Sequence, residues 1–256
     1  MSTPVKSLRQ RCMDGEPVLG AMIFEFFTPG IAQIVKNTGA EFILYDMEHG
    51  GLSLDALKWQ IASARGIGIS PMVRVPRGDY NFVARALDLG AEGLMIPMVD
   101  SAAYARAIAE ATHYPPAGRR GAAFGFAHDA YGSRQPTEIM VAANARNLVI
   151  AQIETERGLA EVDAIAAVDG IDCLWVGHFD LTNFLGIPGQ FEHPEFIDAV
   201  TRIVTAGRKH KKGLGFMAAT PETARTFKDR GFNMQATGTD MAMVTHGIKS
   251  ILDALR

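Results

Sequence analysis

Residues 148–154 read Leu-Val-Ile-Ala-Gln-Ile-Glu, and this stretch decides the fold that we expect. Its first four residues are apolar without interruption, which is typical of a strand covered on both faces in a parallel sheet. Because side chains alternate between the two faces of a strand, Gln152 and Glu154 share one face and Ile153 lies on the other. Two polar groups on one face of an apolar strand must be paired, hydrated or bound to a ligand.

Seven other short apolar runs alternate with amphipathic stretches along the chain. The eight expected strands cover residues 18–24, 42–46, 71–75, 93–97, 148–154, 172–177, 213–217 and 233–237. The expected helices cover residues 29–37, 54–65, 80–89, 102–111, 157–167, 194–211, 221–229 and 240–255. This alternation indicates an α/β protein with one (β/α)8 barrel, or TIM barrel, as a single domain over residues 1–256. A doubly wound sheet is the alternative, but no Gly-x-Gly-x-x-Gly turn follows the first strand.

The composition is that of an ordinary globular protein. Apolar residues make up 48% of the chain and the formal net charge is −3, so neither a nucleic acid nor a membrane is expected as a partner. No apolar run approaches the ~20 residues that span a bilayer, and the first residues lack the apolar core of a signal peptide. The two cysteines, Cys12 and Cys173, do not indicate a disulfide framework, so a reducing compartment fits and the cytoplasm is the default location.

Polar side chains gather where the expected strands end. In a barrel of this kind the carboxyl ends of the strands build the functional site. The polar residues at these ends are Asp46, His49, Arg74, Gln152, Glu154, His178 and Asp180. Each has a structural alternative as well as a functional one. Glu154 and Asp180 could each cap the helix that follows, and Arg74 could be an ion-pair partner of Asp46 or Asp100. His49, in a glycine-rich loop, could be an ordinary polar loop residue.

Taken together, these residues favour metal chemistry. Two carboxylates, Glu154 and Asp180, suit a hard cation such as Mg²⁺ or Mn²⁺ and leave coordination positions open. A 2-oxo acid offers its carboxylate and keto oxygens as a chelate, and the cation would polarise its keto group. Arg74 could face the developing oxyanion, and His49 could move a proton at neutral pH. No lysine ends an expected strand, so a Schiff-base mechanism lacks a nucleophile.

Six stretches resemble the HpcH/HpaI aldolase family, metal-dependent class II pyruvate aldolases on a (β/α)8 barrel. The resemblance covers residues 20–254, and the six stretches occur in the family's order. They are residues 46–49 (DMEH), 74–76 (RVP), 94–99 (LMIPMV), 114–121 (YPPAGRRG), 152–155 (QIET) and 177–181 (GHFDL).

The resemblance implies a role for each motif. Glu154 and Asp180 would bind the divalent metal, which could be Mg²⁺, Mn²⁺ or Co²⁺, and Gln152 would contact the substrate. The backbone at Phe179 and Asp180 would hold the substrate carboxylate. His49 would be the acid/base and Arg74 would stabilise the enolate.

The resemblance also pairs the catalytic histidine with an aspartate that maps onto Asp88. Asp88 ends an expected helix, so it should lie at the opposite end of the barrel from His49 of the same chain. Either a neighbouring subunit supplies this contact or Asp46 orients His49 locally. The family forms hexamers in which the last helix packs on a neighbour, so a homo-oligomer with an exchanged C-terminal helix is expected.

The chain departs from the family at one motif. The family commonly has Gly-Pro-x-Asp-Leu where this chain has Gly-His-Phe-Asp-Leu at residues 177–181. His178 restores a backbone N–H that proline lacks, and Phe179 is bulkier than the usual small residue. Asp180 is kept, so lyase chemistry should survive while the shape of the pocket changes.

The sequence therefore predicts an enzyme that reversibly cleaves a 4-hydroxy-2-oxo acid into pyruvate, or hydroxypyruvate, and an aldehyde. The nearest alternative is another carbon–carbon lyase on the same barrel, acting on a CoA thioester or a phosphoenolpyruvate-type substrate, for which Arg119 and Arg120 could supply a basic pocket. A third hypothesis is a non-catalytic barrel that binds an oxo acid.

Overall fold

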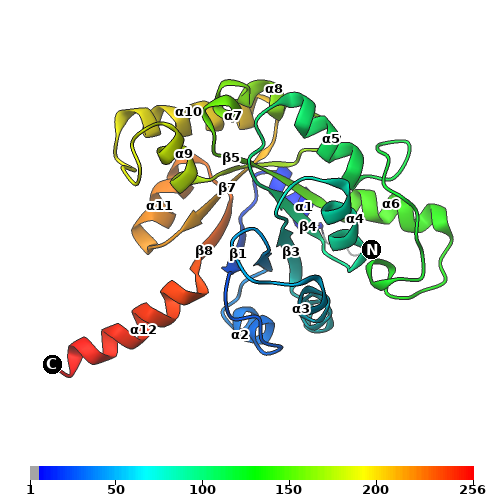
Figure 1. The fold of residues 1–256 in the computed structure, drawn as a ribbon, viewed down its shortest axis with the longest axis horizontal. Coiled ribbons are helices and arrows are strands. Elements are labelled where there is room, and N and C mark those ends of the chain that lie inside the picture. Colours follow the sequence, from blue (N-terminus) through cyan, green and yellow to red (C-terminus); the bar gives the residue numbers. More distant parts are fainter. Residues whose placement is uncertain (1–5) are drawn as a thin grey trace.

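The barrel expected from the sequence is present. The computed structural model describes residues 6–256, in which eight parallel strands close on themselves in chain order (Figure 1). The strands are β1 (Val18–Ile23), β2 (Phe42–Asp46), β3 (Ser70–Arg74), β4 (Gly93–Ile96), β5 (Leu148–Ile153), β6 (Cys173–Val176), β7 (Gly213–Ala218) and β8 (Met234–Thr239). All of them begin and end close to the expected positions, so the (β/α)8 prediction is confirmed.

Alternate residues of each strand pack into two separate apolar cores. In β5, Ile150 packs in a core inside the barrel, whereas Val149 and Ile153 pack between the strands and the surrounding helices. This period of two places Gln152 on the inner face of the barrel. Gln152 and Glu154 are both almost fully buried, and the side-chain amide of Gln152 donates a hydrogen bond to the Glu154 carboxylate, so the two share one face as predicted.

The helices surround the barrel, and some of them were not expected. They are α1 (Leu8–Met13), α2 (Ile31–Asn37), α3 (Leu54–Ile67), α4 (Tyr80–Asp88), α5 (Ala102–Thr112), η1 (Ala127–Asp129), α6 (Pro136–Arg146), α7 (Glu156–Ala160), α8 (Val162–Ala166), α9 (His178–Phe184), α10 (Pro194–Lys209), α11 (Pro221–Arg230) and α12 (Asp240–Ala254). The single helix expected over 157–167 is wrong, because Glu161 breaks it into α7 and α8. The short helices α1 and α9 were missed since fewer than two turns give little periodicity. The helix α6 was not expected either, because its sequence PTEIMVAANAR shows little separation of polar from apolar residues.

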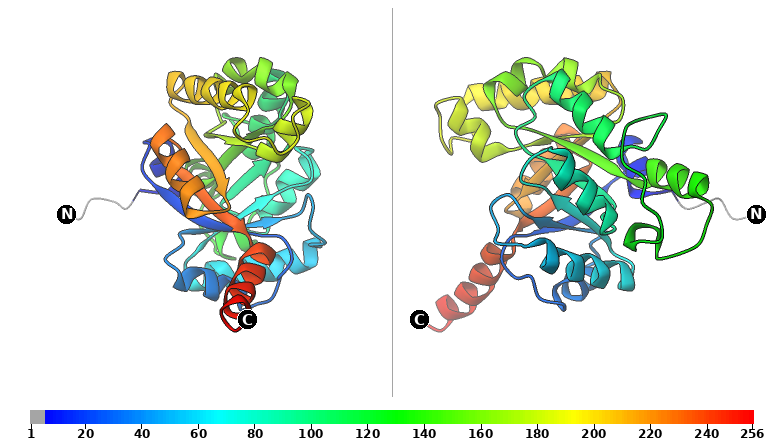
Figure 2. Two further views of the ribbon diagram at one scale, coloured as in Figure 1. Left: turned by 90° about the vertical axis from the view of Figure 1, so that its left-hand side faces the viewer. Right: turned by 45° about the vertical axis from the view of Figure 1, so that its right-hand side comes forward.

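The last helix leaves the barrel. In Figures 1 and 2, α12 projects away from the strands, whereas the other long helices lie against them. Within α12 only Asp240 is buried, and its carboxylate accepts the backbone N–H groups of residues 24, 25 and 26. The large apolar side chains along α12 are all exposed, namely Met241, Met243, Val244, Ile248, Ile251, Leu252 and Leu255. No helix within the described part of the chain is long and apolar enough to cross a bilayer.

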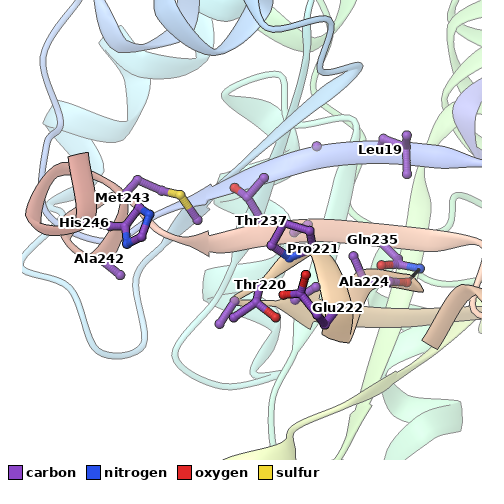
Figure 3. A pocket seen from close by; sticks show the side chains of 14 residues that line it. Leu19, Thr220, Pro221, Glu222, Ala224, Gln235, Thr237, Ala242, Met243 and His246 are labelled. Atoms are coloured by element: carbon purple, nitrogen blue, oxygen red, sulfur yellow. Dashed lines mark hydrogen bonds between the residues drawn. The ribbon is translucent and has the colours of Figure 1, made fainter. Parts of the chain in front are cut away.

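The departure of α12 leaves an apolar cavity beside β8. Its volume is about 780 Å³, and Figure 3 shows that side chains from β1, β8, α11 and the start of α12 surround it. Leu19 of β1 and Pro221 of α11 form part of its wall, and Met243 and His246 lie at the end nearest α12. This cavity occupies the place at which a helix following β8 covers a closed (β/α)8 barrel.

Candidate active site at the barrel mouth

Asp46 organises the loop that carries His49. Its side chain is fully buried at the end of β2, and one carboxylate oxygen accepts the backbone N–H groups of His49 (2.8 Å) and Gly50 (3.0 Å). The other carboxylate oxygen accepts the backbone N–H of Glu48 at 3.3 Å. Asp46 therefore fixes the backbone of the loop and does not contact the imidazole ring. The ring nitrogen Nε2 of His49 instead lies 3.6 Å from a carboxylate oxygen of Glu48, a residue that the sequence analysis did not single out.

Arg74 is held by two carboxylates and keeps one free donor group. Its Nε lies 2.5 Å from Asp46, and its Nη1 lies 3.1 Å from Glu48. The ion pair with Asp46 was one structural alternative raised by the sequence, and it is confirmed; Asp100 pairs with Arg157 instead. Among the described residues, Nη2 of Arg74 is buried without a hydrogen-bond partner. A buried guanidinium N–H without a partner is costly, so this group is available to a ligand.

Glu154 is a buried carboxylate whose charge is poorly compensated. One oxygen accepts the backbone N–H of Met98 at 2.6 Å, and the other accepts the side-chain amide of Gln152. Burial raises the pKa of Glu154 to about 7, against the opposing effect of these two hydrogen bonds. The capping alternative for Glu154 is wrong, because Thr155 caps α7 by accepting the N–H of Gly158 at 2.9 Å.

Gly177 gives the Glu154 carboxylate its space. A Cβ atom on Gly177 would lie 2.2 Å from a carboxylate oxygen of Glu154 and 2.9 Å from the amide nitrogen of Gln152. The strand β6 can therefore approach β5 at this point only because residue 177 has no side chain.

Asp180 lies in the first turn of α9 and faces the other carboxylates. Its charge raises the pKa of both Glu154 and Glu48, although burial is the larger cause in each case. The capping alternative for Asp180 is wrong as well, because α9 begins after Gly177 without any side-chain cap. Glu48, Glu154 and Asp180 are therefore near enough for their negative charges to oppose one another, and a cation between Glu154 and Asp180 would relieve this repulsion.

A small cavity connects these residues. It has a volume of about 180 Å³ and is lined by Met22, Phe24, His49, Arg74, Gln152, Trp175, Val176, Gly177, His178, Phe179, Asp180, Met217 and Thr239. The side chain of His49 is 58% exposed at its edge. The carbonyl oxygen of the Gln152 amide is buried without a partner in the described residues, so it too is free to bind a ligand.

The residues fit a divalent cation. Glu154 and Asp180 supply the oxygen donors that Mg²⁺ and Mn²⁺ prefer, and the repulsion between the carboxylates would be relieved by such an ion. Residues 6–256 contain no group of three or more acidic, cysteine or histidine side chains placed to hold a metal. A cation bound by two protein carboxylates would therefore keep positions open for water and for a chelating substrate.

Three residues raised by the sequence, Asp88, Arg119 and Arg120, do not line this cavity, and a fourth, His178, lines it with a neutral ring. Asp88 ends α4 and pairs with Arg120 at 2.7 Å, so it does not line the cavity of its own chain. His178 lines the cavity, but burial lowers its pKa to about 4 and its ring is neutral near pH 7. Arg119 is exposed and lies 3.6 Å from Glu110, so neither Arg119 nor Arg120 contributes positive charge to the cavity.

Stabilisation of the protein by a metal should depend on pH. Burial raises the pKa of Glu154 to about 7, so the protonated carboxyl stabilises the folded, metal-free protein relative to the ionised carboxylate. This contribution to the free energy of unfolding is complete below about pH 4 and is lost as the pH rises through 7. A cation binds the ionised carboxylate and so releases a proton. We expect a fixed Mn²⁺ concentration to raise the thermal midpoint more at pH 8 than at pH 6, measured by scanning calorimetry. Equal increases at the two pH values would contradict the assignment of Glu154.

Comparison with known proteins gives one consistent result. The family model described as HpcH/HpaI aldolase/citrate lyase matches residues 22–247. A hydroxypyruvate/pyruvate aldolase of Pseudomonas aeruginosa is 33% identical over 255 residues, which cover 98% of this chain and 93% of that protein. A 4-hydroxy-2-oxovalerate aldolase of Novosphingobium aromaticivorans is 36% identical over 94% of this chain and 90% of its own length.

A solved structure agrees. The HpcH/HpaI aldolase from Desulfitobacterium hafniense DCB-2 superposes with a TM-score of 0.92 at 29% identity, over 98% of this chain and 97% of that one. The barrel, the carboxylates at its mouth and the match over most of the chain lead to one assignment. This chain belongs to the HpcH/HpaI aldolase/citrate lyase family.

Proposed function

We propose that the protein is a divalent-metal-dependent aldolase, a carbon–carbon lyase that reversibly cleaves a 4-hydroxy-2-oxo acid into pyruvate or hydroxypyruvate and an aldehyde. The observation that carries the proposal is that Arg74, with its free Nη2, lines one cavity together with Asp180 and Gln152, and that the amide of Gln152 donates a hydrogen bond to the buried carboxylate of Glu154. The relatives named as hydroxypyruvate/pyruvate and 4-hydroxy-2-oxovalerate aldolases support it.

The residues at the cavity have separate roles in binding the oxo acid and in moving protons. A divalent cation held by Glu154 and Asp180 would supply the positive charge that polarises the keto group. The free amide oxygen of Gln152 and the backbone at Phe179 and Asp180 orient the oxo acid. Among the described residues that line the cavity, His49 is the exposed imidazole, whereas the ring of His178 is packed against Phe179, Phe191 and Phe216, so His49 would be the acid/base.

The proton and the electron pair then have defined destinations. His49, directly or through water, removes the proton from the C4 hydroxyl, and the C3–C4 bond breaks to release the aldehyde. The electron pair of that bond moves toward the C2 oxygen, where Nη2 of Arg74 can donate a hydrogen bond. A proton returned to C3 gives the methyl group of pyruvate.

Removal of the metal tests the chemistry directly. EDTA treatment should abolish cleavage, and Mg²⁺, Mn²⁺ or Co²⁺ should restore it, because none of the described residues that line the cavity is a lysine able to replace the cation by a Schiff base. The measurement is the rate of pyruvate release before and after re-addition of each ion. Cleavage that persists in EDTA and is blocked by borohydride in the presence of pyruvate would instead indicate a lysine mechanism.

The other lyase hypotheses have less support. A CoA thioester or a phosphoenolpyruvate-type substrate needs positive charge for its phosphate groups, and Arg119 and Arg120 lie outside the cavity.

We also propose the cytoplasm as the compartment, a view supported by the two free, buried cysteines.

We further propose that α12 is exchanged between copies in a homo-oligomer, a hexamer by family resemblance. The large apolar side chains of α12 are exposed and the helix projects from the barrel (Figures 1 and 2), beside the cavity of about 780 Å³ next to β8. Exposed apolar patches of this kind mark interaction sites. The α12 helix of a second copy supplies an occupant of matching chemistry, since the cavity is lined mostly by apolar groups.

A negative charge introduced on the apolar face of α12 should dissociate this oligomer. Ile251→Asp would place a carboxylate in the exchanged interface, so we expect sedimentation velocity to show monomers where the natural chain is oligomeric. Ser250→Asp is the matched control, because residue 250 lies on the opposite side of the helix from Ile248 and Leu252. A monomeric natural chain, or equal effects of both substitutions, would overturn the exchange.

The oligomer also gives Asp88 a possible partner. We propose that Asp88, one-third exposed and bonded to Arg120, approaches His49 of a neighbouring copy. If so, two inactive variants, His49→Ala and Asp88→Asn, should regain activity when their subunits are mixed, since some sites then combine an intact His49 with an intact Asp88. A mixture that stays inactive after subunit exchange has been demonstrated would contradict this pairing.

A further inference from the structure

The cavity at the barrel mouth has a polar half and an apolar half. The proposed function uses the polar half, formed by His49, Arg74, Gln152 and Asp180, for the oxo acid. The remaining wall is mainly apolar and comes from β1, β6, β7, the end of β8 and the start of α9. Its large apolar side chains are Met22, Phe24, Trp175, Phe179 and Met217, and its polar members are His178 and Thr239. The second substrate, the aldehyde, must meet this apolar wall because the polar half is already taken.

The charges around the cavity disfavour an anionic aldehyde. Arg74 is the one lysine or arginine among the described residues that line it, and two of its nitrogens are already bound to Asp46 and Glu48. Its free Nη2 is assigned to the oxo acid. A carboxylate or phosphate on the aldehyde would therefore lose its hydration without gaining a partner.

Aromatic packing holds the apolar wall in place. The ring of His178 lies 4.6 Å from that of Phe179, 5.2 Å from Phe191 and 5.0 Å from Phe216, measured between ring centroids. Phe179 also meets Phe191 edge-on at 5.3 Å. These contacts fasten the first turn of α9 to the barrel, although the side chain of Phe179 remains 61% exposed at the mouth. An apolar substituent could thus cover Phe179 and gain from its burial.

We propose that the aldehyde partner carries an uncharged, apolar substituent, which packs against Phe24, Phe179 and Met217, and that Phe179 and Met217 set this preference. The inference rests on the proposed aldolase function and names the class of its second substrate. Phe24 lies with its ring 5.2 Å from the guanidinium of Arg74, so it marks the border between the two halves of the cavity.

An isosteric pair of aldehydes tests the preference. Succinic semialdehyde ends in a carboxylate, and 4-methylpentanal has the same shape with an isopropyl group in its place. With Mn²⁺ and pyruvate, we expect kcat/KM for 4-methylpentanal to exceed that for succinic semialdehyde by about tenfold or more, the size of discrimination that an apolar pocket provides. Equal values, or a preference for succinic semialdehyde, would overturn the proposal.

Two substitutions at Met217 locate the preference. Met217→Lys should raise kcat/KM for succinic semialdehyde and lower it for 4-methylpentanal, because it places a cation in the apolar wall. Met217→Gln has similar length and no charge, and it should not produce the gain for succinic semialdehyde. Phe179→Ala should lower kcat/KM for 4-methylpentanal more than for succinic semialdehyde. If the ratio of the two values stays unchanged in all three variants, the wall does not determine specificity.

A separate measurement distinguishes failure of this inference from failure of the proposed function. The natural protein with Mn²⁺ should exchange the methyl protons of pyruvate with D₂O in the absence of any aldehyde. If exchange occurs but succinic semialdehyde is preferred, the aldolase function stands and the apolar aldehyde is wrong. If exchange and cleavage are both absent, the proposed function itself fails.

Discussion

Glu154→Gln should abolish Mn²⁺ binding at the barrel mouth and lower the rate of pyruvate release by about a thousandfold, the scale on which removal of one charge-stabilising group acts. The substitution keeps the size of the side chain and removes its charge, so the cation loses one of its two proposed protein ligands. Glutamine also presents an NH₂ group where Glu154 now accepts hydrogen bonds from Met98 and Gln152, so one of these contacts is lost. Titration calorimetry with Mn²⁺ and a pyruvate-release assay measure the two effects.

A matched control lies two residues away. Glu156→Gln makes the same chemical change at an exposed position in the first turn of α7, outside the cavity. It should leave Mn²⁺ affinity and the cleavage rate within about twofold, because a surface carboxylate contributes little. Full activity of Glu154→Gln in saturating Mn²⁺ would remove Glu154 from the metal site.

Arg74→Ala should lower both cleavage and pyruvate proton exchange by about a hundredfold or more. The substitution deletes the free Nη2 that faces the developing negative charge, and it leaves Asp46 and Glu48 without their cation. The rate of deuterium incorporation into pyruvate, followed by NMR, measures the effect without an aldehyde. Exchange of the pyruvate methyl protons also tests whether the barrel is catalytic at all. The natural protein must therefore show this proton exchange before the variant is measured.

Two further variants separate chemistry from folding. Arg74→Lys keeps a cation beside Asp46 but loses the planar guanidinium, so we expect a natural thermal midpoint with low exchange. Arg77→Ala removes an arginine with a 74% exposed side chain only three residues away, and it should exchange pyruvate at the natural rate. If Arg74→Lys restored full exchange, a positive charge alone would suffice and the role of Nη2 would be wrong.

The fold was predictable because its signal is local. Each strand is a short apolar run, and the alternation within 148–154 placed Gln152 and Glu154 on one shared face without any knowledge of their neighbours. The carboxyl-end rule for parallel barrels then gathered His49 and Arg74 at one cavity. These steps depend on backbone geometry, which every barrel of this class shares.

The remaining features depend on contacts between distant residues. Glu48 was not singled out, because only the folded chain shows that it reaches both Arg74 and the ring of His49. The bulk of Phe179 was noted from the sequence, but its packing could not be predicted for the same reason, since the rings around His178 come from residues 179, 191 and 216. The pairing of Asp88 with Arg120 joins a helix end to a long loop whose course the sequence does not specify.

The bare backbone at Gly177 limits how this enzyme can be redesigned. Any side chain there would begin within 2.2 Å of a Glu154 oxygen, so mutant libraries that include residue 177 will mostly yield inactive clones. Positions 179 and 217 line the same cavity, and a Cβ is already present at both. Directed evolution toward new products should therefore vary residues 179 and 217 and keep Gly177 unchanged.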